Sequence, residues 1–161
     1  METYEFFIIT RAICQMDYPK DYGHILLTQY PNKTEVELFL KGLPPGKHGF
    51  HVHKSADRRQ GCKSACSHYN PFNGTHKGVN EAGNHLGDLG NITVDANGTC
   101  NQKITVNYLP LTGEYQIIGR TLVLHELVDD LGLGSNAESK KTGNSGDRIA
   151  CGVIGYLETV C

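Results

Sequence analysis

Apolar and polar residues alternate along several short stretches of this chain, and turn residues separate those stretches. Residues 35–40 (EVELFL) alternate with a period of two, which is typical of a strand with one face on a core and the other in water. The tetrapeptide DANG at 95–98 predicts a hairpin turn, because Asn-Gly accepts positive φ. No stretch shows a sustained helical period. We predict strands over residues 4–16, 23–30, 34–42, 47–53, 86–95, 99–106, 115–124 and 148–158.

Eight short strands with such turns predict an all-β fold, either an antiparallel sandwich or a barrel. Two segments interrupt the strand pattern, at residues 54–85 and 126–147. Long loops inside a compact domain are commonly functional. The first loop carries three histidines and two cysteines, so an internal cross-link would order it.

The length and composition indicate a single domain over residues 1–161. Apolar residues make up 39% of the chain and charged residues 20%, which argues against wholesale disorder. The net charge of −2 argues against a nucleic-acid partner. No apolar run approaches the roughly 18 residues of a membrane span, and no export signal is visible. We therefore expect a soluble cytoplasmic protein with no membrane partner.

The distribution of the eight histidines points to metal binding, because five of them fall between positions 48 and 76. Within the predicted strand 47–53, His51 and His53 share one face because strand side chains alternate. Two imidazoles on one rigid face form half of a metal site. By the same parity His48 points away, and we expect it to pack or to support a ligand.

A second group of residues offers three imidazoles and one carboxylate: His68, His76, His85 and Asp88. This set matches a tetrahedral zinc site that the protein fills completely, and therefore a structural zinc. His125, just after the predicted strand 115–124, could project toward the same place.

A zinc-finger-like set is an alternative, made of Cys62, Cys66, His68 and His76. Its two histidines are separated by seven residues, longer than the usual three to five. It would also leave His51, His53, His85 and Asp88 without a role.

Five motifs follow one another along the chain: HGFHVH at 48–53, GDLGN at 87–91, IIGRTLVLHE at 117–126, KTGN at 141–144 and RIACGVIG at 148–155. In sequence and order they resemble the copper/zinc superoxide dismutases, over about residues 10–157. The resemblance implies an eight-stranded antiparallel Greek-key β-barrel, an immunoglobulin-like closed sandwich with two long functional loops. It also implies dismutation of the superoxide anion to oxygen and hydrogen peroxide.

The resemblance implies a copper site and a zinc site that share one ligand. Copper would be held by His51, His53, His68 and His125. Zinc would be held by His68, His76, His85 and Asp88. His68 would bridge the metals as an imidazolate, which two divalent cations make possible. Asp129 would orient His51 and His76 together.

The catalytic residues that the resemblance assigns are Arg148 and His68. Arg148 would steer and dock the anion beside the copper, and Lys141 would steer it at the channel rim. As copper is alternately reduced and oxidised, His68 would take up a proton and hand it to the departing peroxide.

The resemblance also implies an intrasubunit disulfide between Cys62 and Cys151. Cys66 stands where the family usually has glycine, which places a second thiol near Cys62. We expect the others to be a buried Cys14 and free thiols at Cys100 and Cys161.

A homodimer is a further implication, with a copper chaperone as a loading partner. The positions that match the family interface stay apolar or small at Ile118, Gly119, Val153 and Gly155, whereas Tyr156 is larger than usual. The motifs are closer to intracellular eukaryotic members than to exported bacterial ones.

Two other classes of protein remain as alternatives. A non-enzymatic metal-binding relative, such as a chaperone's dismutase-like domain or a zinc-only protein, would tend to lack copper ligands or the channel arginine. All of these residues are present here. An adhesion sandwich would leave seven metal-competent side chains unexplained.

Overall fold

The regular structure of the computed structural model, which describes residues 9–158, is almost entirely β. The strands are β1 Thr10–Gln15, β2 Gly23–Tyr30, β3 Lys33–Leu40, β4 Gly46–His53, β5 Arg59–Cys62, β6 Asp88–Val94, β7 Cys100–Val106, β8 Thr121–His125 and β9 Arg148–Tyr156. A 3₁₀ turn, η1, spans Lys63–Ala65, and a short helix, α1, spans Ser139–Thr142. Among the described residues, no helix is long and apolar enough to cross a membrane.

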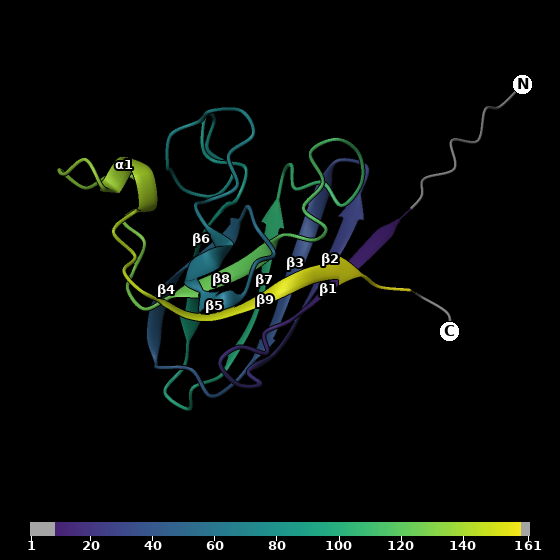
Figure 1. Ribbon diagram of the computed structural model, residues 1–161, viewed down its shortest axis with the longest axis horizontal. Coiled ribbons are helices and arrows are strands. Elements are labelled where there is room, and N and C mark those ends of the chain that lie inside the picture. The colour runs from purple at the N-terminus through teal and green to yellow at the C-terminus, as the bar shows by residue number, and fades with distance from the viewer. Residues whose placement is uncertain (1–8, 159–161) are drawn as a thin grey trace, which may run out of the picture.

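Eight strands, all except β5, form one antiparallel sheet in the order β6-β4-β8-β9-β1-β2-β3-β7. The pairings β1–β9, β4–β8 and β3–β7 join strands that are distant in the chain, as the crossovers of a Greek key require. The end strands β6 and β7 approach each other, and the Thr93 N–H donates to Gln102 Oε1 over 3.0 Å. The sheet therefore curls into a nearly closed barrel (Figure 1), and the predicted all-β fold is confirmed.

The alternation of apolar and polar residues correctly predicts which face of each strand is buried in the core. Along β3, Val36 and Leu38 are fully buried, while Glu35 and Glu37 stay partly exposed. On β4, Phe50 and Val52 belong to the apolar core. Because strand side chains alternate, the opposite face of β4 carries His51 and His53, and the two long loops bury it.

Several predicted boundaries were wrong. The predicted strand 115–124 begins only at Thr121, because Gly119 has a φ of 82°, which a strand does not accommodate. The predicted strand 86–95 begins at Asp88, since the Asp88 N–H donates to His85 O and closes a turn. The short strand β5 was not predicted, and residues 4–8 of the first predicted strand lie outside the described residues.

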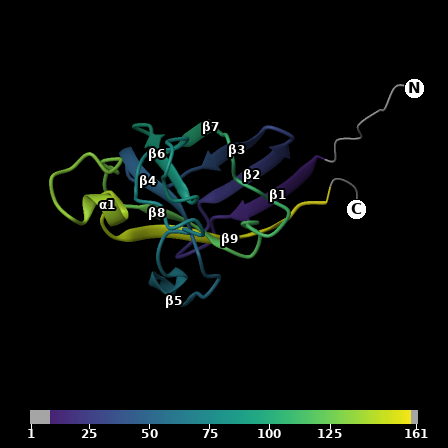
Figure 2. The same ribbon diagram turned by 90° about the horizontal axis from the view of Figure 1, so that it is seen from above.

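A disulfide ties the loop at 54–85 to the barrel. Cys62 and Cys151, 89 positions apart, are bonded with their Cα atoms at 5.8 Å, which confirms the predicted pairing. Further along the loop, Tyr69 N–H donates to Val52 O over 2.8 Å, and Val52 N–H donates to Gly87 O over 2.9 Å. The loop thus runs along the edge of β4, and it projects below the barrel around β5 in Figure 2.

The loop at 126–147, which carries α1, folds around the carboxylate of Asp130. That carboxylate accepts from Ser139 Oγ (2.7 Å), Asn144 Nδ2 (2.8 Å) and the Gly132 N–H (2.9 Å). Helix α1 ends at Gly143, whose φ of 71° is the left-handed conformation that glycine accepts readily. Figure 1 shows this loop at the end of the molecule opposite the chain termini.

Candidate metal centre

Three imidazoles surround the Asp88 carboxylate at the start of β6. Asp88 Oδ1 lies 2.9 Å from His76 Nδ1 and 3.2 Å from Nδ1 of both His68 and His85. Asp88 Oδ2 accepts the backbone N–H groups of His85 (2.9 Å) and Lys77 (3.1 Å), which fixes the orientation of the carboxylate. A tetrahedral zinc with bonds of about 2.0–2.1 Å separates its ligand atoms by about 3.3–3.4 Å. The observed spacing fits that ion.

Four imidazoles form an adjoining cluster with no carboxylate: His51, His53, His68 and His125. One ring nitrogen from each lies within 4.8 Å of the other three, and all four side chains are buried. His53 Nε2 and His125 Nε2 are 3.2 Å apart, and the rings of His51 and His68 stack at 3.9 Å. His68 takes part in both clusters, so the two clusters adjoin through one ring.

The outward nitrogen of each of three rings is fixed by a hydrogen bond. His53 Nδ1 donates to Cys66 O over 2.7 Å, and His125 Nδ1 donates to Gly146 O over 3.0 Å. His51 Nε2 donates to Asp129 Oδ2 over 2.6 Å. The nitrogen that faces the centre of the cluster therefore keeps its lone pair on each ring.

Two buried ring nitrogens, His51 Nδ1 and His68 Nε2, have no hydrogen-bond partner among the described residues. A buried polar atom without a partner costs about 1–3 kcal/mol. Both atoms belong to the four-imidazole cluster, and a cation bound there would accept both lone pairs. An all-nitrogen set is suited to copper, so the residues present fit that metal.

The imidazoles of this cluster are held neutral, as metal ligands must be. Burial, reinforced by the neighbouring rings, holds the pKa values of His51 and His53 well below their usual range. Burial also lowers the pKa of His68, and it lowers that of His125 to about 4. Neutral rings offer a lone pair without first losing a proton.

The carboxylate cluster has the opposite character. Burial alone would lower the pKa of His76, but its hydrogen bonds to Asp129 and Asp88 outweigh burial and raise that pKa to about 9. Burial would raise the pKa of Asp88, yet the surrounding imidazoles hold it well below its usual range. In this cluster the anionic carboxylates of Asp88 and Asp129 therefore stabilise the protonated, cationic form of His76.

Asp129 joins the two clusters. Its Oδ2 accepts from His51, and its Oδ1 accepts from His76 Nε2 over 2.7 Å. Asn91 holds the backbone of Asp129 on both sides, through Asn91 Nδ2 to Asp129 O (3.0 Å) and Asp129 N–H to Asn91 Oδ1 (2.7 Å). Gly143 must be glycine here, because a Cβ would lie 2.0 Å from Asp129 Oδ1.

A cavity of about 570 Å³ opens onto the four-imidazole cluster. Its lining includes three rings of that cluster, together with Lys141 and Arg148. Arg148 Nη1 donates to Cys62 O (2.9 Å) and Lys63 O (3.2 Å), which fixes the guanidinium at the wall of the cavity. Two cationic side chains, the carboxylate of Glu138 and three neutral imidazoles therefore face one space.

His48 and the cysteines near the clusters show the outcome of the other predictions for this region. His48 points away from both clusters, as predicted: its Nδ1 faces His125 O at 2.9 Å and its Nε2 faces Pro44 O at 2.7 Å. The zinc-finger-like alternative was wrong, because the disulfide removes Cys62 as a thiolate ligand. The carbonyls of Cys66 and Gly146 were missed, since a backbone acceptor leaves no residue-type signal.

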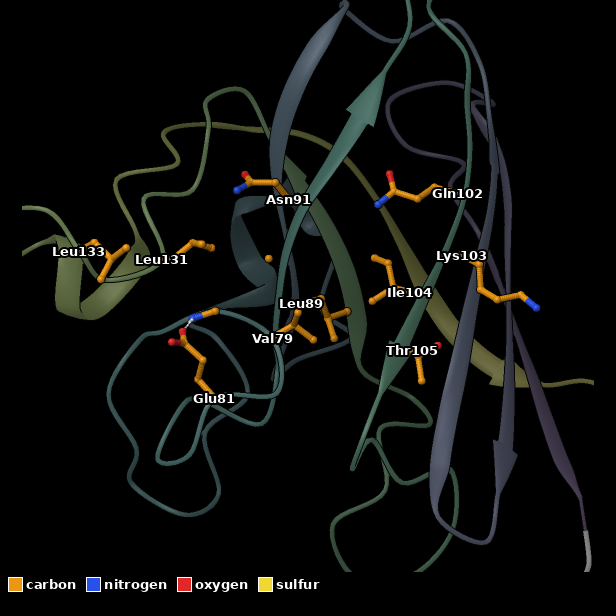
Figure 3. Close-up of a pocket in the computed structure, with 12 residues that line it drawn as sticks. Val79, Glu81, Leu89, Asn91, Gln102, Lys103, Ile104, Thr105, Leu131 and Leu133 are labelled. Atoms are coloured by element: carbon orange, nitrogen blue, oxygen red, sulfur yellow. Dashed lines mark hydrogen bonds between the residues drawn. The ribbon is translucent and has the colours of Figure 1, made fainter.

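Another hollow, of about 470 Å³, lies between the edges of β6 and β7 and the loops beside them (Figure 3). Apolar side chains line it, including Val79, Leu89 and Ile104. Its charged side chains are Glu81 and Lys103, and it contains no imidazole or thiol. This hollow therefore lacks the donor set of a copper or zinc site.

The fold and the site together define a class: a Greek-key β-barrel whose loops bring an all-imidazole and an imidazole–carboxylate metal cluster against each other. Comparison with known proteins agrees. A family model described as "Copper/zinc superoxide dismutase (SODC)" matches residues 21–154. A superoxide dismutase [Cu-Zn] of Paramecium bursaria Chlorella virus 1 is 47% identical over 137 residues, which cover 84% of this chain and 73% of that protein.

Two further relatives extend the comparison. An extracellular superoxide dismutase [Cu-Zn] of Drosophila melanogaster is 46% identical over 143 residues, covering 88% of this chain and 79% of that protein. The solved structure of the clock protein EA4 superposes with a TM-score of 0.88 at 41% identity, over 97% of this chain and all of the other. The chain belongs to the copper/zinc superoxide dismutase family. Its activity is the dismutation of superoxide to oxygen and hydrogen peroxide, with copper and zinc as cofactors.

Proposed function

We propose that His51 binds copper through Nδ1, and that His53, His68 and His125 bind it through Nε2. The observation that carries this assignment is the pair of buried nitrogens without partners, His51 Nδ1 and His68 Nε2. The outward hydrogen bonds of the other two rings, to Cys66 O and Gly146 O, leave Nε2 of each ring to face the same point.

Zinc, in this proposal, is bound by Nδ1 of His68, His76 and His85 and by Oδ1 of Asp88. These four atoms leave no position for a substrate, so zinc has a structural role. It holds the His68 ring between the two clusters. Asp129 couples the sites, since one carboxylate orients a ligand of each metal.

Copper in the all-imidazole site supplies the one-electron oxidation of a first superoxide and the one-electron reduction of a second. Arg148 docks the anion, because its guanidinium is held at the cavity wall beside three of the imidazoles. His68 Nε2 carries a proton during half of the cycle and donates it to the departing peroxide.

Lys141 steers the anion from the rim of the cavity. The chain as a whole carries a net charge of −2, so a local positive field must overcome a general repulsion of the substrate. Steering raises association rates by about 10- to 1000-fold, a range for which superoxide dismutases are themselves a standard example.

The direct test is metal content and dismutation measured on one purified sample loaded with copper and zinc. We expect one copper and one zinc per chain, with rapid turnover. Zinc without copper, and no turnover after thorough copper loading, would support a metal-binding relative that is not an enzyme.

A homodimer is part of the proposal. The segment at Gly119 lies beside β9, with the Gly119 N–H donating to Ile154 O over 2.8 Å. At Gly155 a Cβ would meet no atom of this chain within 4 Å, so packing within the chain does not require glycine there. Close approach of a second copy would require it. Sedimentation should give twice the mass of one chain, and Gly155→Arg should give a monomer; an unchanged mass would contradict this interface.

We further propose a single domain over residues 1–161 of the intracellular eukaryotic type, located in the cytoplasm and loaded by a copper chaperone. The free thiols of Cys14, Cys66 and Cys100 are typical of a reducing compartment. Cell fractionation should recover the chain in the cytosol with copper content that falls when the chaperone is removed. Recovery in the medium would contradict this location.

A further inference from the structure

Cys66 has an unusual backbone for a residue with a side chain. Its φ is 68° and its ψ is −149°, a combination that is nearly restricted to glycine. The thiol is exposed and free. A cysteine here is strained where it stands, so a rearrangement that changes its backbone angles would relieve that strain.

The same short turn holds one half of the disulfide. Cys62 precedes η1 and Cys66 follows it, so the bonded sulfur and the free thiol flank a turn of three residues. The Cys66 N–H donates to Lys63 O over 3.3 Å, and Cys66 Sγ lies 3.4 Å from Ser64 O. A nucleophile and a disulfide therefore share one small segment of chain.

This turn also holds two groups at the cavity. Cys66 O accepts from His53 Nδ1, while Cys62 O and Lys63 O accept from Arg148 Nη1. Movement of the turn would release an imidazole of the copper cluster and the guanidinium together. No other hydrogen bond to the Arg148 guanidinium occurs within residues 9–158 that would hold it in place.

We propose that Cys62, Cys66 and Cys151 form a thiol–disulfide exchange switch. The Cys66 sulfur, as its thiolate, attacks Cys62 Sγ. The Cys62–Cys151 bond breaks, a Cys62–Cys66 bond forms, and Cys151 leaves as a thiolate that takes up a proton. The step exchanges one disulfide for another, so it requires no external oxidant or reductant.

The exchange carries a structural consequence. It replaces a cross-link between positions 89 apart with one between positions 4 apart, and it detaches the 54–85 loop from β9. The turn must change shape to bring the two sulfurs together, which takes the carbonyls of Cys62, Lys63 and Cys66 away from their partners. Dismutation falls as a result. The disulfide exchange itself is independent of the proposed function. The expected fall in dismutation rests on the proposed roles of His53 and Arg148.

The test follows the disulfides of the metal-loaded protein without oxygen, in the presence of a low concentration of glutathione. Samples are quenched with N-ethylmaleimide and mapped by peptide mass spectrometry, and dismutation is measured on the same samples relative to each protein's own starting value. The variants are Cys66→Ser and Cys66→Gly, with Cys100→Ser as the control that removes a different free thiol.

Cys66 is tethered close to the disulfide, so it acts at an effective concentration on the order of millimolar. The glutathione concentration is set to about a tenth of that value. Cys151 should therefore become alkylated about tenfold faster in the unaltered chain than in Cys66→Ser, where only glutathione can attack the disulfide. Cys66→Gly should match Cys66→Ser, and Cys100→Ser should match the unaltered chain. A Cys62–Cys66 peptide should appear in step with the loss of dismutation.

Equal rates of Cys151 alkylation in the unaltered chain and Cys66→Ser would overturn the switch. So would new linkages to Cys14, Cys100 or Cys161 in place of Cys62–Cys66. A Cys62–Cys66 peptide with undiminished dismutation would support the exchange and contradict the proposed roles of His53 and Arg148.

Discussion

The two clusters to which we assign zinc and copper share His68 but differ in how the chain satisfies them. In the zinc cluster, Asp88 Oδ1 lies within 3.2 Å of three imidazoles, so the chain supplies both charges. In the copper cluster no carboxylate faces the centre, and two ring nitrogens lack a partner. The side chains of the zinc cluster are buried. Three rings of the copper cluster line a cavity that also holds Lys141, Arg148 and the carboxylate of Glu138.

Under the proposed assignment, this contrast separates a structural zinc site from a reactive copper site. A cluster filled by opposite charges is stabilised in place and leaves no position for a substrate. A cluster of neutral imidazoles keeps its lone pairs for a redox metal and an open side for an anion. The difference arises from one residue type, since a carboxylate is present among three imidazoles in one case and absent in the other.

The largest expected effect comes from removing a copper imidazole that has no part in the zinc cluster. His125→Ala should reduce dismutation to the background rate and abolish copper binding, with zinc still at one per chain. The matched control is His24→Ala, because His24 is an exposed histidine stacked on Phe39. Metal analysis after dialysis checks both, and loss of zinc together with copper in His125→Ala would break the distinction between the clusters.

The next effect should come from the group that joins them. Asp129→Asn removes the charge that His51 and His76 share, and should weaken binding of both metals by about 10- to 100-fold. Asp95→Asn is the control, because Asp95 is exposed in the hairpin turn at 95–98, where its carboxylate accepts backbone N–H groups and no imidazole. Competition with a chelator measures both affinities. A change confined to one metal would show that Asp129 does not couple the sites.

Arg148→Ala tests the open side of the copper cluster alone. We expect kcat/KM to fall by about tenfold or more and its dependence on salt to weaken, because local steering is lost. Copper and zinc contents should not change. Arg59→Ala is the matched control, since Arg59 is exposed and paired with Asp57. Loss of copper from Arg148→Ala would instead make this arginine a structural residue.

Lys141→Gln should have the smallest effect, roughly a twofold fall in kcat/KM at low salt, because an exposed charge at the rim is screened by solvent and ions. Its neighbour provides the control: Lys140 Nζ donates to Gly132 O and does not line the cavity. Stopped-flow measurements at two ionic strengths compare the variants. Equal effects of Lys140→Gln and Lys141→Gln would indicate net charge rather than a local field.

How much of this could be predicted from the sequence depends on the kind of signal. Alternation along β3 and β4 predicts the buried faces, and parity places His51 and His53 together while turning His48 away. The placement of His68 in both clusters follows only from the family resemblance, because spacing does not reveal a shared ring. The side chains that could bind a metal can be recognised in the sequence, because histidine and aspartate stand out as residue types within the motifs.

The features that could not be predicted from the sequence depend on backbone atoms and backbone angles. The carbonyls of Cys66 and Gly146 fix two imidazoles, but any residue has a carbonyl, so no residue type marks them. The start of the predicted strand 115–124 was wrong for a similar reason, since the positive φ of Gly119 keeps residues 115–120 out of the strand. The hydrogen bonds of Asn91 to Asp129 require loop geometry that only the folded chain provides.

Anomalous diffraction at the copper and zinc absorption edges, on crystals loaded with both metals, tests the central contrast most directly. The account predicts a copper peak contacted by His51 Nδ1 and by Nε2 of His53, His68 and His125. It predicts a separate zinc peak contacted by Asp88 Oδ1 and by Nδ1 of His68, His76 and His85. A single peak, or a copper peak that His51 Nδ1 and His68 Nε2 do not contact, would contradict it.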